Sequence, residues 1–455
     1  MYKQAYLLIL IIYEDEKKMD NLTIFDCLYP TYKIKKPIRL IELFAGIGAQ
    51  AKALKNLKVN FEYYKIVEFD KYAIASYNAI HNTNFKPLDI TKIHASDLEI
   101  VDTDKYEYIM TYSFPCQDLS LAGKGKGMAK DSGTRSSLLW EVERILKECK
   151  ELPQVLLMEN VPEVIGEANI KDFQEWQLLL EKLGYSNYVD LLNSKDYEIP
   201  QNRNRCFMIS ILGDYNYNFP KPRKLNVKAL DFIDFPIDEK YILPKKYLEK
   251  ITFQEKGNEI ANLNYTTFEQ SNVVHNINKL CPTIRACMKD NDYLNTINFA
   301  IPLETTVCIN SKVNGKQPKV QDRIYDSNGL ITAITTSFLP KLGIKISENT
   351  KKGYSLSQHG DGIYIDRPQQ KRGCVQKDMI QTIKTSGKDI GIVIWNGNSY
   401  IVKKITPKEC WRFMGFSDED FEKASKVNNN TQLYKQAGNS IVVNVLEAIF
   451  KELII

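Results

Sequence analysis

Short apolar runs alternate with amphipathic stretches over the first 220 residues of the chain. The apolar runs that predict buried strands lie at 39–44, 106–112, 155–158, 185–193 and 206–211. The stretches that predict helices lie at 49–57, 138–146 and 173–183. Strands that alternate with helices predict an α/β fold with a doubly wound, mostly parallel sheet. Ligands and chemistry collect at the carboxyl ends of the strands in such a sheet.

The pattern changes near residue 219. From there to about residue 400 the chain is richer in Asn, Lys and turn residues, with short strand-like pieces and no long helical stretch. A pattern that predicts helices begins again at 405. We therefore expect an N-terminal extension at 1–38, an α/β domain at 39–220 that residues 401–455 rejoin, and a smaller, mostly β domain at 221–400.

The chain opens with an apolar run at 5–12 that is too short to span a bilayer. A signal peptide is conceivable, but the charged run at 14–18 follows it without a small-residue cleavage site. Because Met19 begins a more ordinary opening, our hypothesis is that residues 1–18 come from an upstream start. We expect no membrane association.

Composition and charge narrow the class of protein. The 455 residues are 44% hydrophobic and 26% charged, as in ordinary globular proteins, and the net charge of +5 permits a polyanionic partner without requiring one. Nine cysteines without a CxxC pair favour reduced thiols in a cytoplasm over a disulfide framework. The four histidines have no metal-ligand spacing, so we expect no metal site.

Cys116 is the strongest candidate for chemistry. It follows the strand predicted at 106–112, and Pro115 stiffens the turn that carries it. A Gly- and Lys-rich stretch at 122–128 comes next, and a thiolate beside positive charge has a lowered pKa and is a usable nucleophile. The alternative is a small buried side chain that happens to be cysteine.

A ligand cleft is predicted at the ends of the first strands. The glycine turn at 45–48 joins a strand to a helix, as in proteins that bring a nucleotide-like ligand close to backbone amides, although it also fits a helix-packing glycine pair. Glu68 ends the next strand and Asp89 a third short strand, while Asp70 is expected to cap a helix. Either acid could be a cap or a solvated turn, but their shared position at strand ends favours a cofactor cleft.

Three charged residues follow at later strands. Glu159 stands at the tip of the apolar strand at 155–158, where poor solvation should raise its pKa toward the range useful for proton donation; the alternative is a helix cap. Arg203 and Arg205 alternate at the mouth of the strand at 206–211, so they point to one face as a fork for a base edge or phosphates. The alternative for this pair is a solvated edge with salt bridges.

Two helix starts are also predicted. Ser136 and Ser137 should supply caps for the helix that begins near 138. Thr406 should be an N-cap, with Pro407 at the first helical position, Glu409 completing a capping box, and Gly415 stopping the helix.

Taken together and in order, these motifs resemble those of the DNA (cytosine-5) methyltransferases, and the resemblance covers nearly everything from 39 to 452. The matching motifs are Phe44-Ala45-Gly46-Ile47-Gly48, Phe114-Pro115-Cys116-Gln117, Glu159-Asn160-Val161, Gln201 to Arg205, Thr406 to Arg412, and Gly438-Asn439-Ser440. The stretch at 112–143 looks most like bacterial enzymes that methylate CG sites. Ser113 and Leu88 depart from glycines that are common in the family.

The resemblance implies a Rossmann-like S-adenosylmethionine domain and a target-recognition domain at 221–400 that reads double-stranded DNA. It implies that Cys116 adds to C6 of a flipped-out cytosine, that Glu159 acts at N3, and that Arg205 contacts the base with Arg203 in support. The implied cofactor residues are Phe44, Ala45, Gly46, Gly48, Glu68, Asp89, Pro115, Asn439 and Ser440. The implied DNA-contacting loop carries Gly123, Lys124, Lys126 and Arg135.

The resemblance also implies a biological role, and it leaves alternatives open. We expect a monomer, in a restriction-modification system whose endonuclease acts separately, although a solitary phage or bacterial enzyme also fits. A tRNA or RNA cytosine-5 methyltransferase is a rival, which the long segment after Arg205 disfavours. A catalytically silent DNA-binding subunit is another, which the intact Cys116, Glu159 and Arg205 disfavour.

Overall fold

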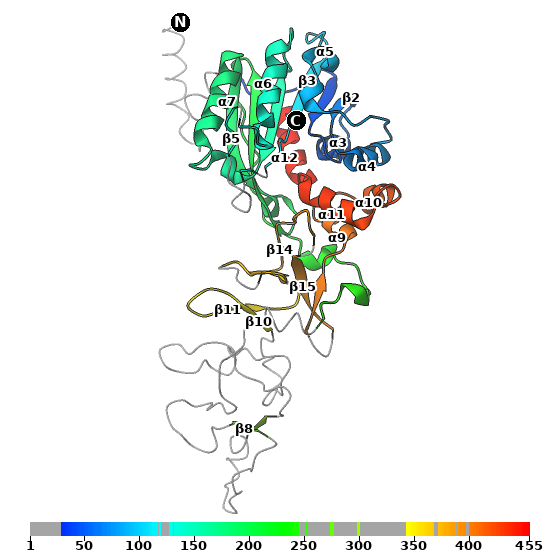
Figure 1. Ribbon diagram of the computed structural model, residues 1–455, viewed down its shortest axis with the longest axis vertical. Coiled ribbons are helices and arrows are strands. Elements are labelled where there is room, and N and C mark those ends of the chain that lie inside the picture. The colour runs from blue at the N-terminus through cyan, green and yellow to red at the C-terminus, as the bar shows by residue number, and fades with distance from the viewer. Residues whose placement is uncertain are drawn as a thin grey trace, which may run out of the picture.

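The computed structural model describes residues 29–116, 118–119, 127–130, 132–244, 252, 274–276, 298–300, 343–367, 372–387, 389–396 and 400–455. Figure 1 shows two parts, an α/β part and a smaller part built of short strands, with helices α9 (Pro407–Arg412), α10 (Asp418–Ser425) and α11 (Asn430–Asn439) beside their junction. None of the helices in the described stretches is both long and apolar enough to cross a membrane.

A six-stranded sheet forms the centre of the α/β part. Its strands, in the order in which they pair, are β2 (Phe61–Val67), β1 (Ile38–Leu43), β3 (Glu107–Tyr112), β4 (Val155–Asn160), β7 (Asn204–Leu212) and β5 (Tyr185–Asn193). The first four are parallel, whereas β7 is antiparallel to both β4 and β5. The predicted doubly wound, mostly parallel sheet is therefore confirmed.

Helices cover both faces of this sheet because successive strand side chains point to opposite sides. The helices of the α/β part are α3 (Ala49–Asn56), α4 (Lys71–His81), α5 (Ala95–Leu98), α6 (Leu139–Glu148), α7 (Ile170–Lys182) and α12 (Val443–Ile454). Leu40 and Ile109 face a core shared with α3 and α12, and Ile41 and Met110 face a core shared with α5, α6 and α7. The C-terminal helix thus completes one face of the sheet that the first strands build.

Short 3-10 helices lie at Ile90–Lys92, Ser136–Leu138, Pro162–Ile165, Ser194–Tyr197, Ala229–Phe232 and Glu239–Tyr241. The first of these corrects a prediction, because no strand ends at Asp89. Instead Asp89 caps the turn, and its Oδ1 accepts hydrogen bonds from the amide and the hydroxyl of Thr91 at 3.1 and 2.9 Å. An Asp–x–Thr sequence satisfies its own backbone locally, and this favours a turn over a strand.

The described residues of the smaller part form a four-stranded antiparallel sheet and three strand pairs. Its strands are β6 (Gln201–Asn202), β8 (Val274–Asn276), β9 (Asn298–Ala300), β10 (Ile344–Ser347), β11 (Tyr354–Ser357), β12 (Gly362–Tyr364), β13 (Val375–Gln376), β14 (Ile380–Gln381), β15 (Ile390–Trp395) and β16 (Tyr400–Lys404). The four-stranded sheet has the order β13-β12-β15-β16. A parallel pairing of β14 with β6, which precedes β7, attaches this part to the central sheet.

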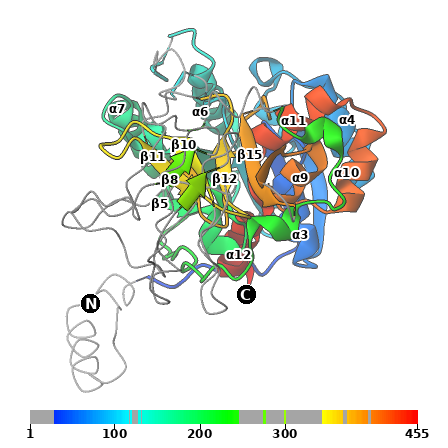
Figure 2. The ribbon, with the colours of Figure 1, turned by 90° about the horizontal axis from the view of Figure 1, so that it is seen from below.

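The first helix at the junction, α9, begins as the sequence predicts. Thr406 caps α9, its hydroxyl accepts from the amide of Glu409 at 3.2 Å, and the Glu409 carboxylate accepts from the amide of Thr406 at 2.8 Å. Gly415 follows in the left-handed region at φ +82°. Seen from below, α3, α4 and α9 to α11 gather on one side and α6 and α7 on the other (Figure 2).

Candidate active site

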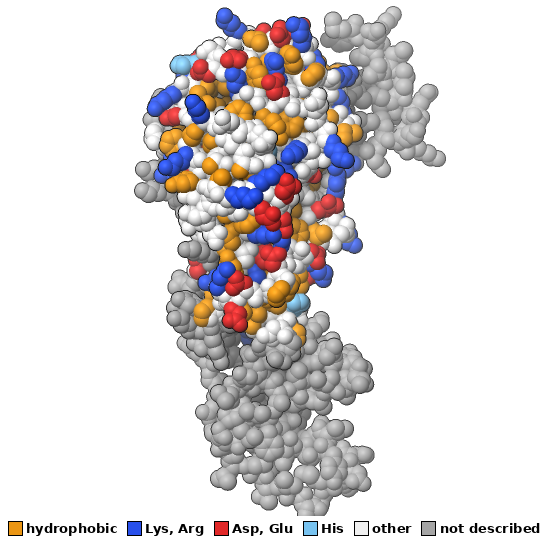
Figure 3. Space-filling model, turned by 90° about the vertical axis from the view of Figure 1, so that its right-hand side faces the viewer, with side chains coloured by type: hydrophobic (Ala, Val, Ile, Leu, Met, Phe, Trp, Pro, Cys, Tyr) orange, Lys and Arg blue, Asp and Glu red, His pale blue; other side chains and the backbone are white. Residues whose placement is uncertain are grey.

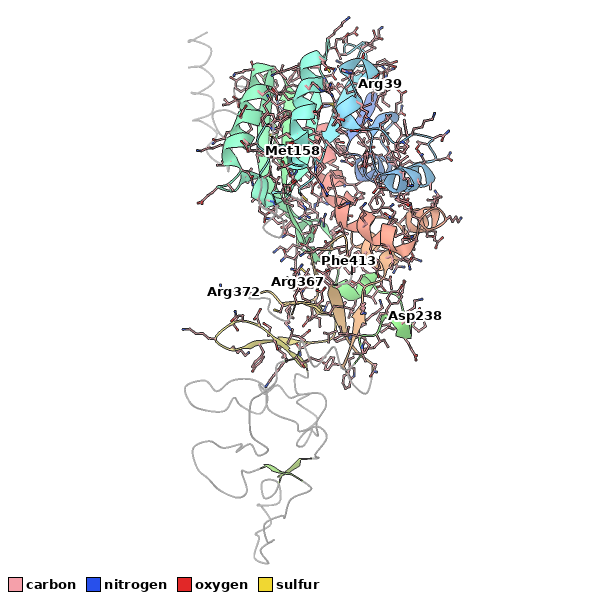
Figure 4. The ribbon with its side chains drawn as sticks, in the orientation of Figure 1. Arg39, Met158, Asp238, Arg367, Arg372 and Phe413 are labelled. Atoms are coloured by element: carbon pink, nitrogen blue, oxygen red, sulfur yellow. The ribbon has the colours of Figure 1, made fainter. Side chains whose placement is uncertain are left out.

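Strand register brings the predicted site residues to one edge of the sheet. Val67, Leu43, Tyr112 and Met158 pair across the four adjacent parallel strands, so they form one row. The residues that directly follow this row are Glu68, Phe44, Ser113 and Glu159. They therefore share the carboxyl edge, where chemistry was expected. Figure 4 labels Met158 in β4 and Phe413 at the junction with the smaller part.

The turn that carries Cys116 is anchored at consecutive carbonyls. Asn160 Nδ2, from the end of β4, donates to the carbonyl of Phe114 at 3.0 Å. Ser136 Oγ donates to the carbonyl of Pro115 at 2.7 Å. The prediction that Ser136 and Ser137 cap the following helix is wrong, because Leu138 is the N-cap of α6 and no side chain caps it. The hydroxyl expected at a helix end holds the thiol-bearing turn instead.

Glu159 lies against Arg205. Arg205 Nε is 3.2 Å from Glu159 Oε1, and only 9% of the Glu159 side chain is exposed. Burial raises the pKa of the Glu159 carboxyl, and the positive charges of Arg205 and Arg203 oppose this shift. The predicted direction is confirmed. A carboxyl with a raised pKa is more readily protonated than an ordinary glutamate and is therefore better suited to donate a proton.

The Cys116 thiol is half-buried beside this pair. Burial, followed by the negative charge of Glu159, raises the pKa of the thiol, and Arg205 and Arg203 counter it only in part. The predicted lowering of the Cys116 pKa is therefore wrong, because the described residues raise it. Lys124 and Lys126, on which that prediction rested, lie outside them, as does Gly123.

Arg203 differs from Arg205 in its partners, which are backbone carbonyls. It is 4% exposed, and its guanidinium donates to the carbonyls of Ile383 at 3.0 Å, Gly438 at 3.1 Å and Ser440 at 2.8 Å. Burial lowers the pKa of Arg203 to about 9, and the charge of Arg205 acts in the same direction. The two arginines share the neighbourhood of Glu159, but only Arg205 is ion-paired to it. Arg203 joins the strand mouth to the Gly-Asn-Ser segment and to the smaller part.

The glycine turn after β1 has the geometry of a ligand cradle. Phe44 and Gly46 have φ of +58°, and an ideal Cβ on Gly46 would meet no heavy atom within 4 Å. The Glu68 carboxylate accepts from the amides of Gly46 at 2.9 Å and of Asp70 at 2.7 Å. Burial raises the pKa of Glu68, against the effect of these amides. Ala45 and Gly48 are buried within the turn, which leaves the Gly46 side open.

The remaining acids and the C-terminal motif lie around this cradle. The hydrogen bonds from Thr91 lower the pKa of the Asp89 carboxyl. Asp70 caps α4 as predicted, accepting from the amide of Tyr72 at 2.9 Å, and forms an ion pair with Lys435 of α11 at 2.7 Å. This contact ties α11 to the start of α4. Its last residue, Asn439, is exposed, and Ser440 is buried.

Two exposed apolar residues, to which the sequence analysis assigned no role in the site, stand beside the acids. Phe69 is 77% exposed and Leu88 41% exposed. The amide of Leu88 donates to the carbonyl of Glu68 at 2.8 Å, which brings the two segments together. Exposed apolar side chains next to a hydrogen-bonding carboxylate suit a flat ring with a polar appendage. An aromatic residue directly after a strand-end acid was the available signal.

Arg135 is the described member of the predicted DNA loop. Its amide donates to Asp118 Oδ2 at 2.9 Å, on the far side of Cys116 from Pro115. The face in Figure 3 carries Lys and Arg interspersed with Asp and Glu, so it is not a continuous basic surface. Among the described residues, no three His, Cys, Asp or Glu side chains are grouped to hold a metal ion.

Comparisons with known proteins agree with this arrangement. The profile of the family described as C-5 cytosine-specific DNA methylase matches residues 38–455. The chain is 31% identical to the type II methyltransferase M2.ScrFI of Lactococcus lactis subsp. cremoris, over 91% of this chain and 99% of that protein. It is 30% identical to the type II methyltransferase M.HhaI of Haemophilus parahaemolyticus, over 90% and 93% of the two chains. The solved structure of Entamoeba histolytica methyltransferase EhMeth shares the fold, with a TM-score of 0.51, 15% identity, and 92% and 98% coverage.

Proposed function

The chain belongs to the family of C-5 cytosine-specific DNA methylases, and we propose that it methylates a flipped-out cytosine in a short duplex sequence through a covalent bond to Cys116. The resemblance that the ordered motifs indicated is confirmed. The chain is a DNA cytosine-5 methyltransferase that uses S-adenosylmethionine.

The convergence of Cys116, Glu159 and Arg205 carries the proposal. The Cys116 sulfur, as thiolate, adds to C6 of the cytosine, and the protonated Glu159 carboxyl donates to N3, so the ring becomes nucleophilic at C5. Arg205 contacts the base and, at 3.2 Å from Glu159, holds that carboxyl in place. Once C5 carries the methyl group, a base removes the C5 proton, the sulfur leaves C6 as thiolate and N3 returns its proton to Glu159, which restores the aromatic ring. The cytosine must leave the stack because this chemistry needs access to its ring face.

The cofactor fits the cradle at the carboxyl edge of the sheet. The open side of Gly46, the Glu68 carboxylate and the exposed Phe69 suit a ribose and a flat base. We assign Phe44, Ala45, Gly46, Gly48, Pro115, Asn439 and Ser440 to the wall of this site, with Glu68 at the ribose and Asp89 at the adenine. When bound, S-adenosylmethionine supplies an electrophilic methyl group to C5.

The remaining elements of the proposal concern DNA and biological context. Residues 39–220 and 401–455 form the catalytic domain, and 221–400 is the target-recognition domain. The loop with Gly123, Lys124, Lys126 and Arg135 contacts phosphates. We propose a monomeric cytoplasmic enzyme of a restriction-modification system with a separate endonuclease. The two type II relatives support this context, and the similar orphan methyltransferase M.SPRI of Bacillus phage SPR supports a solitary enzyme instead.

The test is methyl transfer to plasmid DNA by the wild type and by Cys116→Ala, followed by conversion sequencing of 5-methylcytosine. We expect methylated cytosines in one short context with the wild type and none with the variant, while DNA binding stays largely intact. Full activity of Cys116→Ala would refute the nucleophile. Methyl label entering tRNA but not DNA would support an RNA cytosine-5 methyltransferase. DNA binding without methylation of either polymer would support a catalytically silent DNA-binding subunit.

A further inference from the structure

Arg135 and Ser136 form hydrogen bonds with the chain on both sides of Cys116. Ser136 Oγ donates to the carbonyl of Pro115 at 2.7 Å, and the amide of Arg135 donates to Asp118 Oδ2 at 2.9 Å. We propose that Ser136 is a positioning residue, which sets the direction of the Cys116 thiol toward the base. This inference rests on the proposed role of Cys116 as the nucleophile.

Few backbone rotations remain available to the turn that carries Cys116. Proline fixes its own φ, and the peptide bond that joins Pro115 to Cys116 is planar. The only soft backbone rotation left at Pro115 is ψ, which turns its carbonyl and the amide of Cys116 together. A donor fixed to the Pro115 carbonyl therefore fixes the direction in which Cys116 leaves the turn. Asn160 does the same for the preceding carbonyl, that of Phe114, at 3.0 Å.

Ser136 is built for this task. Its residue surface is 0% exposed, so water does not compete for the Pro115 carbonyl. It begins a short 3-10 helix, Ser136–Leu138, that continues into α6. The adjacent helix, whose Leu139, Val142 and Ile145 are fully buried, gives the hydroxyl a rigid base. The hydrogen bond thus connects the reacting turn to a packed helix.

The second set of contacts lies beyond the thiol. The Asp118 carbonyl accepts from the amide of Gly127 at 3.2 Å, and the amide of Leu119 donates to the carbonyl of Cys116 at 3.1 Å. Together with the Arg135 contact, these bonds close the chain around Cys116. A displacement of about 1 Å at a reacting atom can lower a rate about 100-fold without a comparable change in binding.

The experiment compares Ser136→Ala with Ser137→Ala. The Ser137 hydroxyl bonds the carbonyl of Thr134 at 2.6 Å within its own turn, so the control removes the same atom from the next residue. Four quantities are measured: the dissociation constants for duplex DNA and S-adenosylmethionine, the melting temperature, and the single-turnover rate of covalent trapping on DNA that contains 5-fluorocytosine. Fluorine at C5 cannot leave as a proton does, so the Cys116–C6 bond persists and can be counted.

We expect Ser136→Ala to slow trapping at least about tenfold, with both dissociation constants within twofold of the wild type, and Ser137→Ala to trap normally. Asp118→Ala, which removes the Arg135 contact, should also slow trapping without weakening DNA binding. Normal trapping by Ser136→Ala would overturn the inference, and so would a loss of trapping that merely follows a loss of melting temperature and DNA binding. Failure of the proposed function is distinct, because Cys116→Ala would then remain active.

Discussion

Arg205 Nε lies 3.2 Å from Glu159 Oε1, and the Cys116 thiol shares their surroundings. The arginine and the carboxylate act on the thiol with opposite signs. The charge of Glu159 raises the pKa of Cys116 and the charge of Arg205 lowers it, so burial decides the result. The described surroundings of Cys116 therefore favour the thiol over the thiolate.

This balance predicts the pH dependence of alkylation at Cys116. The rate with iodoacetamide, followed by mass spectrometry of the peptide that contains Cys116, should rise with pH to a midpoint above that of ordinary cysteine. Arg205→Ala removes a positive charge and should move the midpoint to higher pH. Glu159→Gln removes a negative charge and should move it to lower pH. Unchanged midpoints in both variants would contradict the assigned charge coupling.

Glu159→Gln should also separate thiol reactivity from catalysis. The amide cannot donate the proton that the carboxyl donates, so turnover should fall roughly 10²- to 10⁴-fold, the usual scale for a general acid. Cys116 should nevertheless alkylate faster than in the wild type at the alkaline pH where the thiol titrates, because its pKa is lower without the nearby carboxylate. Steady-state methylation and alkylation of the same preparation test both statements. A wild-type turnover number would show that the proton comes from another group.

The strands of the site were predictable from sequence because their apolar runs are local. The run at 155–158 and the glutamate after it indicate both β4 and the raised pKa of Glu159. The state of Cys116 was not predictable, since burial and the distance to Glu159 are set by packing. Phe69 was overlooked because an exposed aromatic residue has no periodic pattern.

Arg203 shows the same limit more plainly. Its carbonyl partners, in Ile383, Gly438 and Ser440, lie 180, 235 and 237 residues away in the sequence. The alternation of Arg203 with Arg205 correctly placed both near one site. It could not show that the Arg203 guanidinium donates to backbone carbonyls while the Arg205 guanidinium pairs with Glu159. This difference depends on how the C-terminal segment packs against the strand.

Glu42 should make the stability of the protein depend on pH. It is fully buried, it accepts from the Tyr77 hydroxyl at 2.6 Å, and burial raises its pKa to about 7. The folded state holds this proton more tightly than the unfolded state, whose glutamate pKa is about 4.3. The free energy of unfolding contributed by Glu42 is therefore present at low pH and is lost as pH rises toward 7.

Glu42→Gln is uncharged at every pH and should flatten this dependence. At pH 8 the free energy of unfolding of the variant should exceed that of the wild type by about 2–3 kcal/mol. Near pH 4.5 the two values should be similar. Burial also raises the pKa of Glu107 to about 7, so a residual slope of the same sign should remain. Urea unfolding at the two pH values measures the effect. Parallel pH profiles for the two proteins would contradict it.

Breaking the buried pair of Lys403 and Glu409 should cost far more stability than breaking a surface pair. Lys403 Nζ lies 2.5 Å from Glu409 Oε2, and the two residues are 1% and 0% exposed. Lys403→Met leaves the Glu409 carboxylate buried without its cation, which should lower the free energy of unfolding by about 3–5 kcal/mol. Lys423→Met, which breaks a pair with the 75% exposed Glu419 side chain, is the matched control and should cost less than about 1 kcal/mol. Urea unfolding of both variants decides the point, since equal losses would mean that burial adds nothing to the pair. A larger loss for Lys403→Met would show that the contact between β16 and α9 contributes to the free energy of unfolding.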